Sequence, residues 1–272
     1  MDHRVALVTR AGEYVGPALA RALAAGGHSL VLHGADEALV EELGGQTQVC
    51  AIGLAEVPLT GPGSLAEATG WRRLVDGALA RFGRLDCAAI YPPSGTAAVF
   101  CSGPLLAAAP SDLTDLAGYA TSTLHALQVL IPPLRAAGGG QIVVFTSDAG
   151  ARPEPGWSIY GAVRAGQSFL VQAAALEHAG EGLSINAVGS KNVVGPGFPG
   201  APAEGLDDRH VPSGPWSRQL ESESPAGRMG TMAELAAFCM PLLDGSSRYQ
   251  TAQYFSFSGG WNTAARQAGT GT

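Results

Sequence analysis

The stretch VALVTRAGEYVG, residues 5–16, decides the fold expected of this chain. A short apolar run is followed by a glycine-containing turn and then by the start of a helical pattern, which is how a strand–turn–helix unit of a parallel sheet begins. Arg10 and Tyr14 stand in this turn, where such a unit normally carries glycine. The order of strand, turn and helix is therefore kept, but the side chains of Arg10 and Tyr14 occupy a turn in which glycine usually leaves the backbone accessible.

The rest of the chain repeats this alternation of strands and helices. Short runs rich in Val, Ile and Leu predict strands at residues 4–9, 29–33, 48–52, 86–90, 141–146, 184–188 and 253–257. Longer Ala- and Leu-rich patterns predict helices at residues 15–26, 36–44, 65–82, 112–136, 157–179 and 232–244. We therefore expect an α/β fold with a doubly wound parallel sheet of about seven strands and helices on both faces.

One segment interrupts this rhythm. Residues 191–216, KNVVGPGFPGAPAEGLDDRHVPSGPW, are dense in Gly and Pro, so no regular element is expected there. The segment follows the carboxyl end of the sixth predicted strand, where open α/β sheets bind ligands, which favours a lid over a disordered loop. The sequence shows no repeat and no internal linker, so we expect one domain over residues 1–264 and a flexible tail at 265–272.

Composition limits the class of protein. Of 272 residues, 46% are hydrophobic and 14% are charged, which is enough to bury one large core. A formal net charge of -7 disfavours nucleic acid as a partner, because phosphate binding requires clustered Lys and Arg. The four cysteines lack the spacing of metal ligands, so we expect reduced core thiols and no metal. No apolar run reaches the ~18 residues of a membrane span, so we expect a cytoplasmic protein.

Three side chains with complementary chemistry are predicted to meet. Ser147 falls at the end of a strand, Tyr160 follows in a helix, and Arg164 comes one helical turn later on the same face. A permanent cation within ~4–6 Å favours the ionised form of a neighbouring acid by roughly 1–3 pKa units, so Arg164 is expected to favour the Tyr160 phenolate. Tyr160 then acts as a general base and Ser147 fixes the substrate oxygen. The domain over residues 1–264 is accordingly expected to be catalytic.

This pattern resembles the short-chain dehydrogenase/reductase superfamily, whose members carry Ser followed by Tyr-x-x-x-Lys. The resemblance covers nearly the whole chain and includes VALVT at 5–9, RFGRLD at 81–86 and FSFSGGW at 255–261. It implies a single Rossmann-like domain. Three departures accompany it: Arg164 replaces the Lys, the glycines of the first turn are broken, and IYPP at 90–93 replaces Asn-Asn-Ala-Gly.

The departures concern the nicotinamide cofactor of those dehydrogenases. Tyr14 occupies the space in which the turn glycines let a dinucleotide approach the backbone. The segment VLHGAD at 31–36 has no acidic residue directly at the end of the second strand, although Asp36 is close. The combination resembles the halohydrin dehalogenases, most of all their G-type members. That resemblance implies a carbon–halide lyase with no cofactor, which converts vicinal halohydrins reversibly to epoxides plus halide and opens epoxides with azide, cyanide or nitrite.

The same resemblance implies a homotetramer that binds a halohydrin or epoxide and a small anion. The expected halide-binding residues combine the ring of Tyr14 with a turn of backbone amides after the sixth strand: Tyr14, Gly189, Ser190, Lys191, Asn192 and Val193. Lys191 is either a solvated loop side chain or an attraction for anions at the pocket mouth. The expected walls of the substrate pocket are apolar or aromatic: Ile90, Tyr91, Pro92, Phe198 and Trp216.

Two other functions remain open from the residues alone. An NAD(P)-dependent short-chain reductase would use Arg10 to bind the phosphate of NADP. A catalytically silent homologue would keep the fold and bind a small ligand. The presence of Ser147, Tyr160 and Arg164 together favours an enzyme over the silent homologue.

Overall fold

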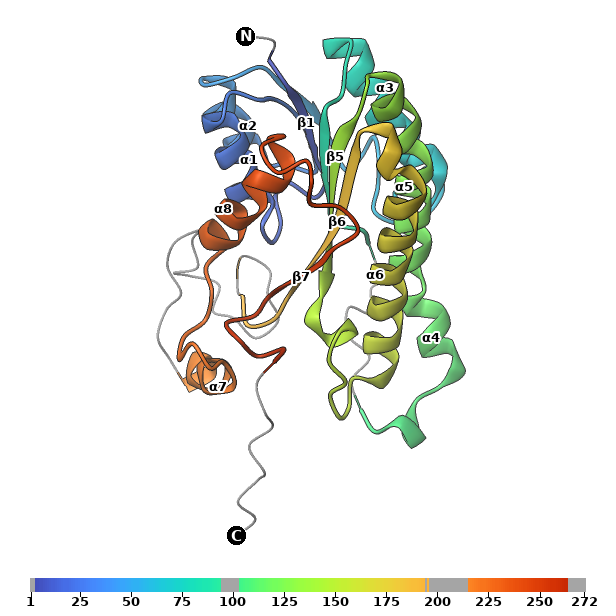
Figure 1. Ribbon diagram of the computed structural model, residues 1–272, viewed down its shortest axis with the longest axis vertical. Coiled ribbons are helices and arrows are strands. Elements are labelled where there is room, and N and C mark those ends of the chain that lie inside the picture. The colour runs from blue at the N-terminus through green and yellow to red at the C-terminus, as the bar shows by residue number, and fades with distance from the viewer. Residues whose placement is uncertain (1–2, 94–102, 194, 196–214, 264–272) are drawn as a thin grey trace.

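The protein folds around one parallel β-sheet with helices on both faces (Figure 1). This computed structural model describes residues 3–93, 103–193, 195 and 215–263. The sheet has seven strands in the order β3-β2-β1-β4-β5-β6-β7. The predicted single-domain, doubly wound, Rossmann-like α/β fold is confirmed.

All strand pairs are parallel, so the carboxyl ends of the strands share one edge of the sheet. The strands are β1 (Val5–Val8), β2 (Ser29–His33), β3 (Val49–Ile52), β4 (Cys87–Ile90), β5 (Gly140–Ser147), β6 (Leu183–Ser190) and β7 (Tyr254–Phe257). The order reverses between β1 and β4, and open α/β sheets bind their ligands at such a switch point. The edge beside the ends of β1 and β4 is therefore where a site is expected.

Helices connect the strands and cover both faces of the sheet. They are α1 (Gly16–Ala25), α2 (Glu37–Gly44), α3 (Ala68–Phe82), α4 (Pro110–Leu116), α5 (Gly118–Ala136), α6 (Ser158–His178), α7 (Pro215–Glu223) and α8 (Met232–Leu243). Short 3-10 helices occur at η1 (Leu105–Ala107), η2 (Asp148–Gly150) and η3 (Ala179–Glu181). Helices α1, α2 and α8 lie on one side of the sheet, and α3, α5 and α6 lie on the other (Figure 1).

The helices depart from the prediction in three places. Helix α3 begins at Ala68 instead of residue 65, because the Leu65 carbonyl accepts from the side chains of Trp71 (2.8 Å) and Ser122 (2.7 Å). The helix predicted at 112–136 is two helices, α4 and α5, that meet at Ala117. Helix α7 overlaps the end of the loop predicted at 191–216, since Pro215 is compatible with the first position of a helix.

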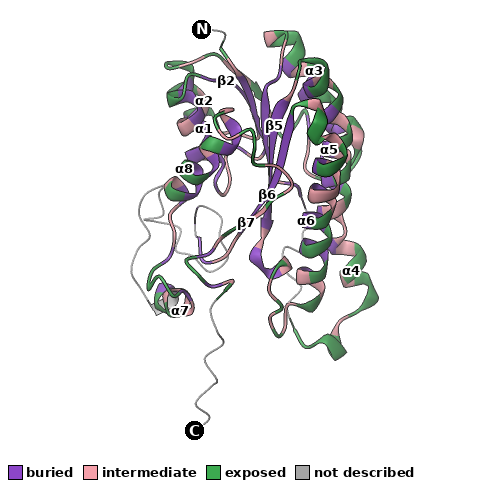
Figure 2. Cartoon of the chain, in the orientation of Figure 1, coloured by how far each residue is buried: buried purple, intermediate pink, exposed green. Residues whose placement is uncertain are grey.

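Each face of the sheet has its own apolar layer. Side chains alternate along a strand, so Leu7 of β1 packs toward α3, α5 and α6, while Ala6 packs toward α1, α2 and α8. Trp71 and Leu19 are fully buried on opposite sides. Figure 2 shows β5 and β6 buried along nearly their whole length and the outer helix faces exposed. Full burial of one such side chain stabilises a fold by about 1.5–3 kcal/mol, so these layers fix the strand ends that carry the site.

Several predictions fall on residues outside the described ranges. These are Phe198, Cys101, most of the loop predicted at 191–216 and the tail predicted at 265–272. Cys50 is half-buried, Cys87 and Cys239 are buried, and all three are free thiols. Within the described ranges, no helix is long and apolar enough to cross a membrane, and no group of side chains could hold a metal ion.

Candidate active site

The end of β5 and the start of α6 carry the predicted catalytic residues, and η2 connects the two elements. Ser147 is the last residue of β5, and η2 leads from it toward α6. A Cβ added to Gly150 would lie 2.6 Å from the backbone nitrogen of Ala165, so η2 packs directly against the backbone of α6. Ala149 of η2 and Tyr160 of α6 belong to one buried cluster. This packing places the end of β5 next to the turn of α6 that carries Tyr160.

Tyr160 and Arg164 form a buried pair. They are 5% and 2% exposed, and Arg164 Cζ lies 5.1 Å from the centroid of the Tyr160 ring. Burial lowers the pKa of Arg164, but the interactions with Tyr160, Tyr119 and Tyr91 and a hydrogen bond with Tyr160 outweigh it, and the pKa lies above its ordinary value. The guanidinium is therefore a permanent cation in contact with the phenol.

An aromatic frame surrounds this pair. The Tyr160 ring is edge-on to Tyr119 at 6.2 Å and to Trp157 at 5.7 Å between centroids. Water is thus displaced from around the phenol, which strengthens its interaction with Arg164. Among the described residues, Arg164 Nε has no hydrogen-bond partner. A buried donor of this kind is available to a ligand oxygen or to water.

The Ser147 hydroxyl hydrogen has no acceptor in the part of the chain that the structure describes. Its Oγ accepts from the backbone N–H of Ala149 at 3.3 Å, which leaves the hydroxyl hydrogen to donate to a substrate oxygen. The next residue, Asp148, is fully buried and accepts from the hydroxyls of Tyr254 and Ser256. Burial raises the pKa of Asp148, against the opposing effect of these hydrogen bonds. The buried carboxylate ties η2 to β7 and so fixes the chain directly after Ser147.

The turn after β1 keeps the backbone shape of a glycine turn although Arg10 and Tyr14 stand at two of its positions. Arg10 and Tyr14 have φ values of 52° and 51°, in the left-handed region. Each non-glycine residue there costs roughly 1–2 kcal/mol. Gly16 remains necessary, because a Cβ would lie 2.5 Å from the Arg10 carbonyl oxygen. The ring of His33, at the end of β2, accepts from the Arg10 N–H at 3.4 Å and supports the turn.

The side chain of Tyr14 lies across the carboxyl ends of three strands. Its ring centroid is 5.2 Å from that of Tyr91, which follows β4, and 6.1 Å from that of Phe145 in β5. Its hydroxyl is hydrogen-bonded to Ser190 Oγ at the end of β6. Burial raises the pKa of Tyr14, so the phenol stays neutral. The aromatic side chain fills the crevice at the switch point of the sheet.

Lys191, the single lysine of the chain, is held within the protein. Its Nζ lies 3.1 Å from a carboxylate oxygen of Glu154 and 4.8 Å from the ring centroid of Trp261. Arg152 Cζ lies 4.7 Å from the same ring. The Lys191 N–H donates to the carbonyl of Phe257 at 3.3 Å. Lys191 is therefore ion-paired with Glu154, and its two interpretations, a solvated loop side chain or an attraction for anions, stay predictions.

The other residues predicted around the halide have structural partners. A Cβ on Gly189 would lie 2.8 Å from a carboxylate oxygen of Asp148. The Asn192 side chain donates to the carbonyl of Leu220 at 3.0 Å, which joins the end of β6 to α7. Val193 is 4% exposed and forms an isolated β-bridge with Gly230. These contacts organise the chain after β6.

The residues predicted as pocket walls separate into different places. Ile90 is fully buried in the core on the α3 and α5 side of the sheet. Tyr91 and Pro92 follow it, and the Tyr91 ring packs under the Arg10 guanidinium, whose Cζ is 4.1 Å from the centroid. Phe198 and the Trp216 side chain lie outside what the structure describes. Tyr91 is the member of this set that lies beside Tyr14.

Residues that sequence reasoning missed surround Arg164. Tyr119 of α5 lies with its ring centroid 3.4 Å from Arg164 Cζ, and Gln167 accepts a hydrogen bond from Arg164 Nη1 at 2.9 Å. Gln167 could have been found, because it follows Arg164 by three positions on the same helix face. Tyr119 could not, because its contact depends on how α5 packs on α6.

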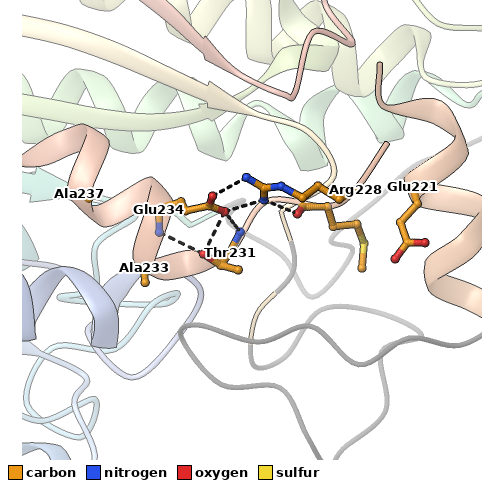
Figure 3. Close-up of a pocket in the computed structure, with 7 residues that line it drawn as sticks. Glu221, Arg228, Thr231, Ala233, Glu234 and Ala237 are labelled. Atoms are coloured by element: carbon orange, nitrogen blue, oxygen red, sulfur yellow. Dashed lines mark hydrogen bonds and ion pairs between the residues drawn. The ribbon is translucent and has the colours of Figure 1, made fainter. Parts of the chain in front are cut away.

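An open pocket of about 640 Å³ lies between α7 and α8. Figure 3 shows Arg228, Thr231 and Glu234 joined by hydrogen bonds along one side, with Glu221 of α7 opposite. Arg228 Nη2 donates to Glu234 Oε1 at 2.6 Å, and Glu234 and Thr231 form the capping box of α8. The pocket excludes Ser147, Tyr160 and Arg164, and its charged side chains serve the start of a helix.

A family model described as enoyl-(acyl carrier protein) reductase matches residues 13–262. The chain belongs to the short-chain dehydrogenase/reductase superfamily. A sorbitol dehydrogenase of Cereibacter sphaeroides is 27% identical over 266 residues, covering 96% of this chain and 98% of the relative. The (2S)-[(R)-hydroxy(phenyl)methyl]succinyl-CoA dehydrogenase subunit BbsC of Thauera aromatica is 30% identical over 262 residues, covering 94% of each.

Two solved structures share the fold. Levodione reductase superposes with a TM-score of 0.76 at 22% identity, over 96% of this chain and 98% of the other. Acetoin dehydrogenase from Enterobacter cloacae gives 0.73 at 24% identity, over 98% of both chains. At these identities the likeness concerns the arrangement of strands and helices.

The comparisons correct the functional prediction. The sorbitol and succinyl-CoA relatives are dehydrogenases, so the assignment as a halohydrin dehalogenase, a carbon–halide lyase, is wrong. Their similarity extends over nearly the full chain, whereas the dehalogenase resemblance gave decisive weight to a few positions, chiefly Tyr14 and Arg164. The findings support the oxidoreductase alternative, and a halohydrin partner has no support.

The superfamily implies a nicotinamide dinucleotide, and the residues of the crevice do not fit it as they lie. The Tyr14 ring fills the switch point and its hydroxyl is bonded to Ser190. The Arg10 guanidinium, expected to bind a phosphate in the reductase alternative, is paired with Glu13 and stacked on Tyr91. A dinucleotide in the usual crevice would therefore overlap the ring of Tyr14.

Proposed function

We propose that the protein is an oxidoreductase of this superfamily that acts on a small alcohol or carbonyl compound, with Tyr160 exchanging a proton with the substrate oxygen. The names of the two relatives support this class, since each specifies dehydrogenation of a hydroxyl-bearing compound. The observation that carries the proposal is the buried hydrogen-bonded pair of Tyr160 and Arg164. A phenol beside a permanent cation can release its proton to an oxygen and take it back.

Ser147 has a second role in this proposal. Its hydroxyl accepts from Ala149 N–H and so has its own hydrogen free for the substrate oxygen. A donor fixed at the end of a strand holds that oxygen in place for proton transfer, which acts over about 2.6–3.2 Å between heavy atoms. Arg164 stabilises the phenolate that remains. Ser147, Tyr160 and Arg164 are therefore the proposed catalytic residues.

The hydride of this chemistry comes from the nicotinamide dinucleotide in other members of the superfamily. A dinucleotide bound here would accept or supply this hydride, and its binding would require the Tyr14 ring to leave the crevice. The proposal rests on the proton transfer that the protein's own side chains perform. The substrate is a small molecule whose oxygen reaches Ser147 and Tyr160.

The test is a conversion assay with the full chain. Sorbitol, aryl 3-hydroxyacyl thioesters, simple secondary alcohols and the matching ketones are each incubated with and without NAD(H) or NADP(H), and products are measured by mass spectrometry. At least one compound should be converted, and Tyr160→Phe should reduce the rate by about 10²–10⁴, the usual contribution of a general acid or base. The matched control is Tyr249→Phe, because Tyr249 is 99% exposed. A Tyr160→Phe variant as fast as the parent protein contradicts the proposal, as does a panel in which nothing is converted.

A homotetramer is part of the proposal. Phe169 and Leu176 of α6 are 73% and 71% exposed, and Leu124 of α5 is 39% exposed. Apolar side chains of this size on neighbouring helices are typical of a surface that pairs with another copy. Pairing these two long helices with another copy supplies one of the two interfaces that a closed assembly of four chains needs.

A further inference from the structure

Four buried residues, Arg164, Gln167, Thr123 and Tyr119, form a closed ring of contacts that includes the Arg164 guanidinium. Arg164 Nη1 donates to Gln167 Oε1 at 2.9 Å, and Gln167 Nε2 donates to Thr123 Oγ1 at 3.0 Å. The Thr123 hydroxyl donates to the carbonyl of Tyr119 at 2.7 Å. The ring of Tyr119 then stacks on the guanidinium, with Arg164 Cζ 3.4 Å from its centroid. None of the four residues is more than 2% exposed.

The direction of every hydrogen bond in this ring is determined. The Gln167 oxygen must face Arg164, which has donors only, so its amide nitrogen must face Thr123. Gln167 Nε2 also lies 3.4 Å from the carbonyl of Phe145 in β5, which agrees with this orientation. The Thr123 hydroxyl accepts from Gln167 and can therefore donate only to Tyr119. A reversed amide would leave buried groups unpaired, so the ring has one arrangement.

We propose that Gln167, Thr123 and Tyr119 are positioning residues that hold the Arg164 guanidinium in one orientation beside Tyr160. The inference rests on the proposed proton transfer by Tyr160. A planar guanidinium can stack on Tyr119 and donate to Gln167 at the same time, whereas a lysine ammonium is a single point charge on a flexible stem. The ring explains how an arginine can serve where related enzymes carry lysine.

Titratable groups from four parts of the fold face this cation. Tyr160 is on α6 itself, Tyr119 is on α5, Tyr91 follows β4, and Tyr254 of β7 also interacts with Arg164. If the guanidinium turned away from Tyr160, its electrostatic interaction with Tyr160 would weaken relative to its interactions with the other three phenols. Gln167 and Thr123 carry no charge, so replacing them changes the orientation of the cation without changing the net charge of the site.

The first experiment observes the guanidinium directly and needs no substrate. In the full chain with ¹⁵N-labelled arginine, the side-chain signals of Arg164 are assigned by their loss in Arg164→Lys. The parent protein should show separate signals for the two Nη groups, because rotation of the guanidinium is blocked. In Gln167→Leu and in Thr123→Val, the two Nη signals should merge into one. Thr123→Ser keeps the hydroxyl group and should therefore show two separate signals, as the parent protein does.

The matched control for the ring is Ser168→Ala. Ser168 is the next buried polar residue on α6, and its hydroxyl donates to the backbone carbonyl of Arg164 at 3.0 Å and not to the guanidinium. Its replacement should leave the Arg164 signals unchanged. If Gln167→Leu does not fold, the same Arg164 signals are measured in Thr123→Val, which is nearly isosteric with the parent protein. Separate, unshifted Arg164 signals in a folded Gln167→Leu or Thr123→Val variant overturn the inference.

The second experiment measures pH dependence with a compound converted in the assay above. In Gln167→Leu, kcat at neutral pH should fall by about tenfold and recover as the pH is raised by about one unit, since one pKa unit corresponds to a factor of ten. KM should stay within about twofold, and Ser168→Ala should keep the parent profile. A change in KM with an unchanged pH profile contradicts the inference. An active Tyr160→Phe variant overturns the proposed function instead, and the signals of Arg164 still decide the positioning role.

Discussion

The hydroxyl of Tyr14 is hydrogen-bonded to Ser190, which joins the turn after β1 to the end of β6 across the crevice of the sheet. The ring between these two points occupies space that a dinucleotide needs. Removing it should open the crevice, and glycine is also the residue best suited to the left-handed backbone at position 14, where φ is 51°.

Tyr14→Gly should therefore bind NADH or NADPH at least about tenfold more tightly than the parent protein, a gain of roughly 1.4 kcal/mol. Isothermal titration calorimetry measures this difference. Tyr14→Phe is the control, because it keeps the ring and loses only the hydroxyl, and it should bind as weakly as the parent. Equal affinities for the Gly and Phe variants would show that the ring does not limit access.

Replacing Arg164 by lysine should preserve the fold and shift the activity to higher pH. Lysine keeps the positive charge but loses the planar contact with Tyr119 and the fixed hydrogen bond to Gln167. We expect a loss of about tenfold at neutral pH, partly recovered about one pH unit higher. Circular dichroism checks the fold and a pH–rate profile checks the activity. An unchanged profile would count against Arg164 as the cation that assists Tyr160.

His33 should make the protein less stable in mild acid. It is fully buried, and its Nε2 donates to the Val57 carbonyl at 2.7 Å while Nδ1 accepts from Arg10 N–H. Burial lowers the pKa of His33 below its ordinary 6.5, despite the opposing hydrogen bond to Val57. The unfolded chain therefore binds a proton first as the pH falls, so stability is complete above about pH 6.5 and decreases below it.

The free energy of unfolding, from urea denaturation between pH 7.5 and about 5, tests this expectation. His33→Gln removes the titration and should give a flatter dependence on pH than the parent protein. His28 is also buried with a lowered pKa, so His28→Gln should flatten the curve in the same direction and the double variant should be flattest. Parallel curves for the parent and His33→Gln would refute the assignment to His33.

Gly189→Ala should destabilise the end of β6. A Cβ there would press on the Tyr254 hydroxyl and lie 2.8 Å from Asp148, within the buried group that fixes the chain after Ser147. Overpacking of this kind typically costs about 1–3 kcal/mol. Gly44→Ala is the matched control, since a Cβ at that position of α2 meets nothing within 4 Å and alanine favours a helix by up to about 1 kcal/mol. Thermal denaturation should move the two variants in opposite directions, and equal shifts would contradict the prediction.

Phe169→Glu should reduce the size of the assembly. The side chain is 73% exposed on α6, and a carboxylate cannot be buried against another subunit without a partner. Light scattering after size exclusion should give four copies for the parent protein and fewer for the variant. Leu79→Glu is the control, because Leu79 is 38% exposed and lies on α3, which is neither of these two helices. A monomeric parent protein would contradict the homotetramer.

Much of the fold could be predicted because it depends on local pattern. Apolar runs such as Val5–Val8 mark strands, and the spacing of Tyr160 and Arg164 on one helix marks a shared face. Composition misled at Pro215, where a segment rich in Gly and Pro turns into helix α7. Helix α3 also starts later than predicted, because side chains from two helices donate hydrogen bonds to the Leu65 carbonyl.

Only the part of the site that lies on one helix, Tyr160 and Arg164 on α6, could be predicted from the sequence. Tyr119 stacks on Arg164 from another helix, and Asp148 accepts hydrogen bonds from the hydroxyl groups of two residues of β7. These contacts depend on how the elements pack, so the spacing of residues along the sequence does not predict them. The function was misjudged for a related reason. Single departures at Tyr14 and Arg164 pointed to a dehalogenase, whereas the similarity of the whole chain points to dehydrogenases.

The left-handed turn at Arg10 and Tyr14 has a consequence for engineering. Its path is supported by its neighbours, namely the backbone of Gly16 and the imidazole of His33, although Arg10 and Tyr14 both carry large side chains. Positions 10 and 14 can therefore accept varied side chains while the main chain stays in place. Libraries randomised at these two sites offer a direct way to resize the hollow at the sheet edge and select new ligands for the same scaffold.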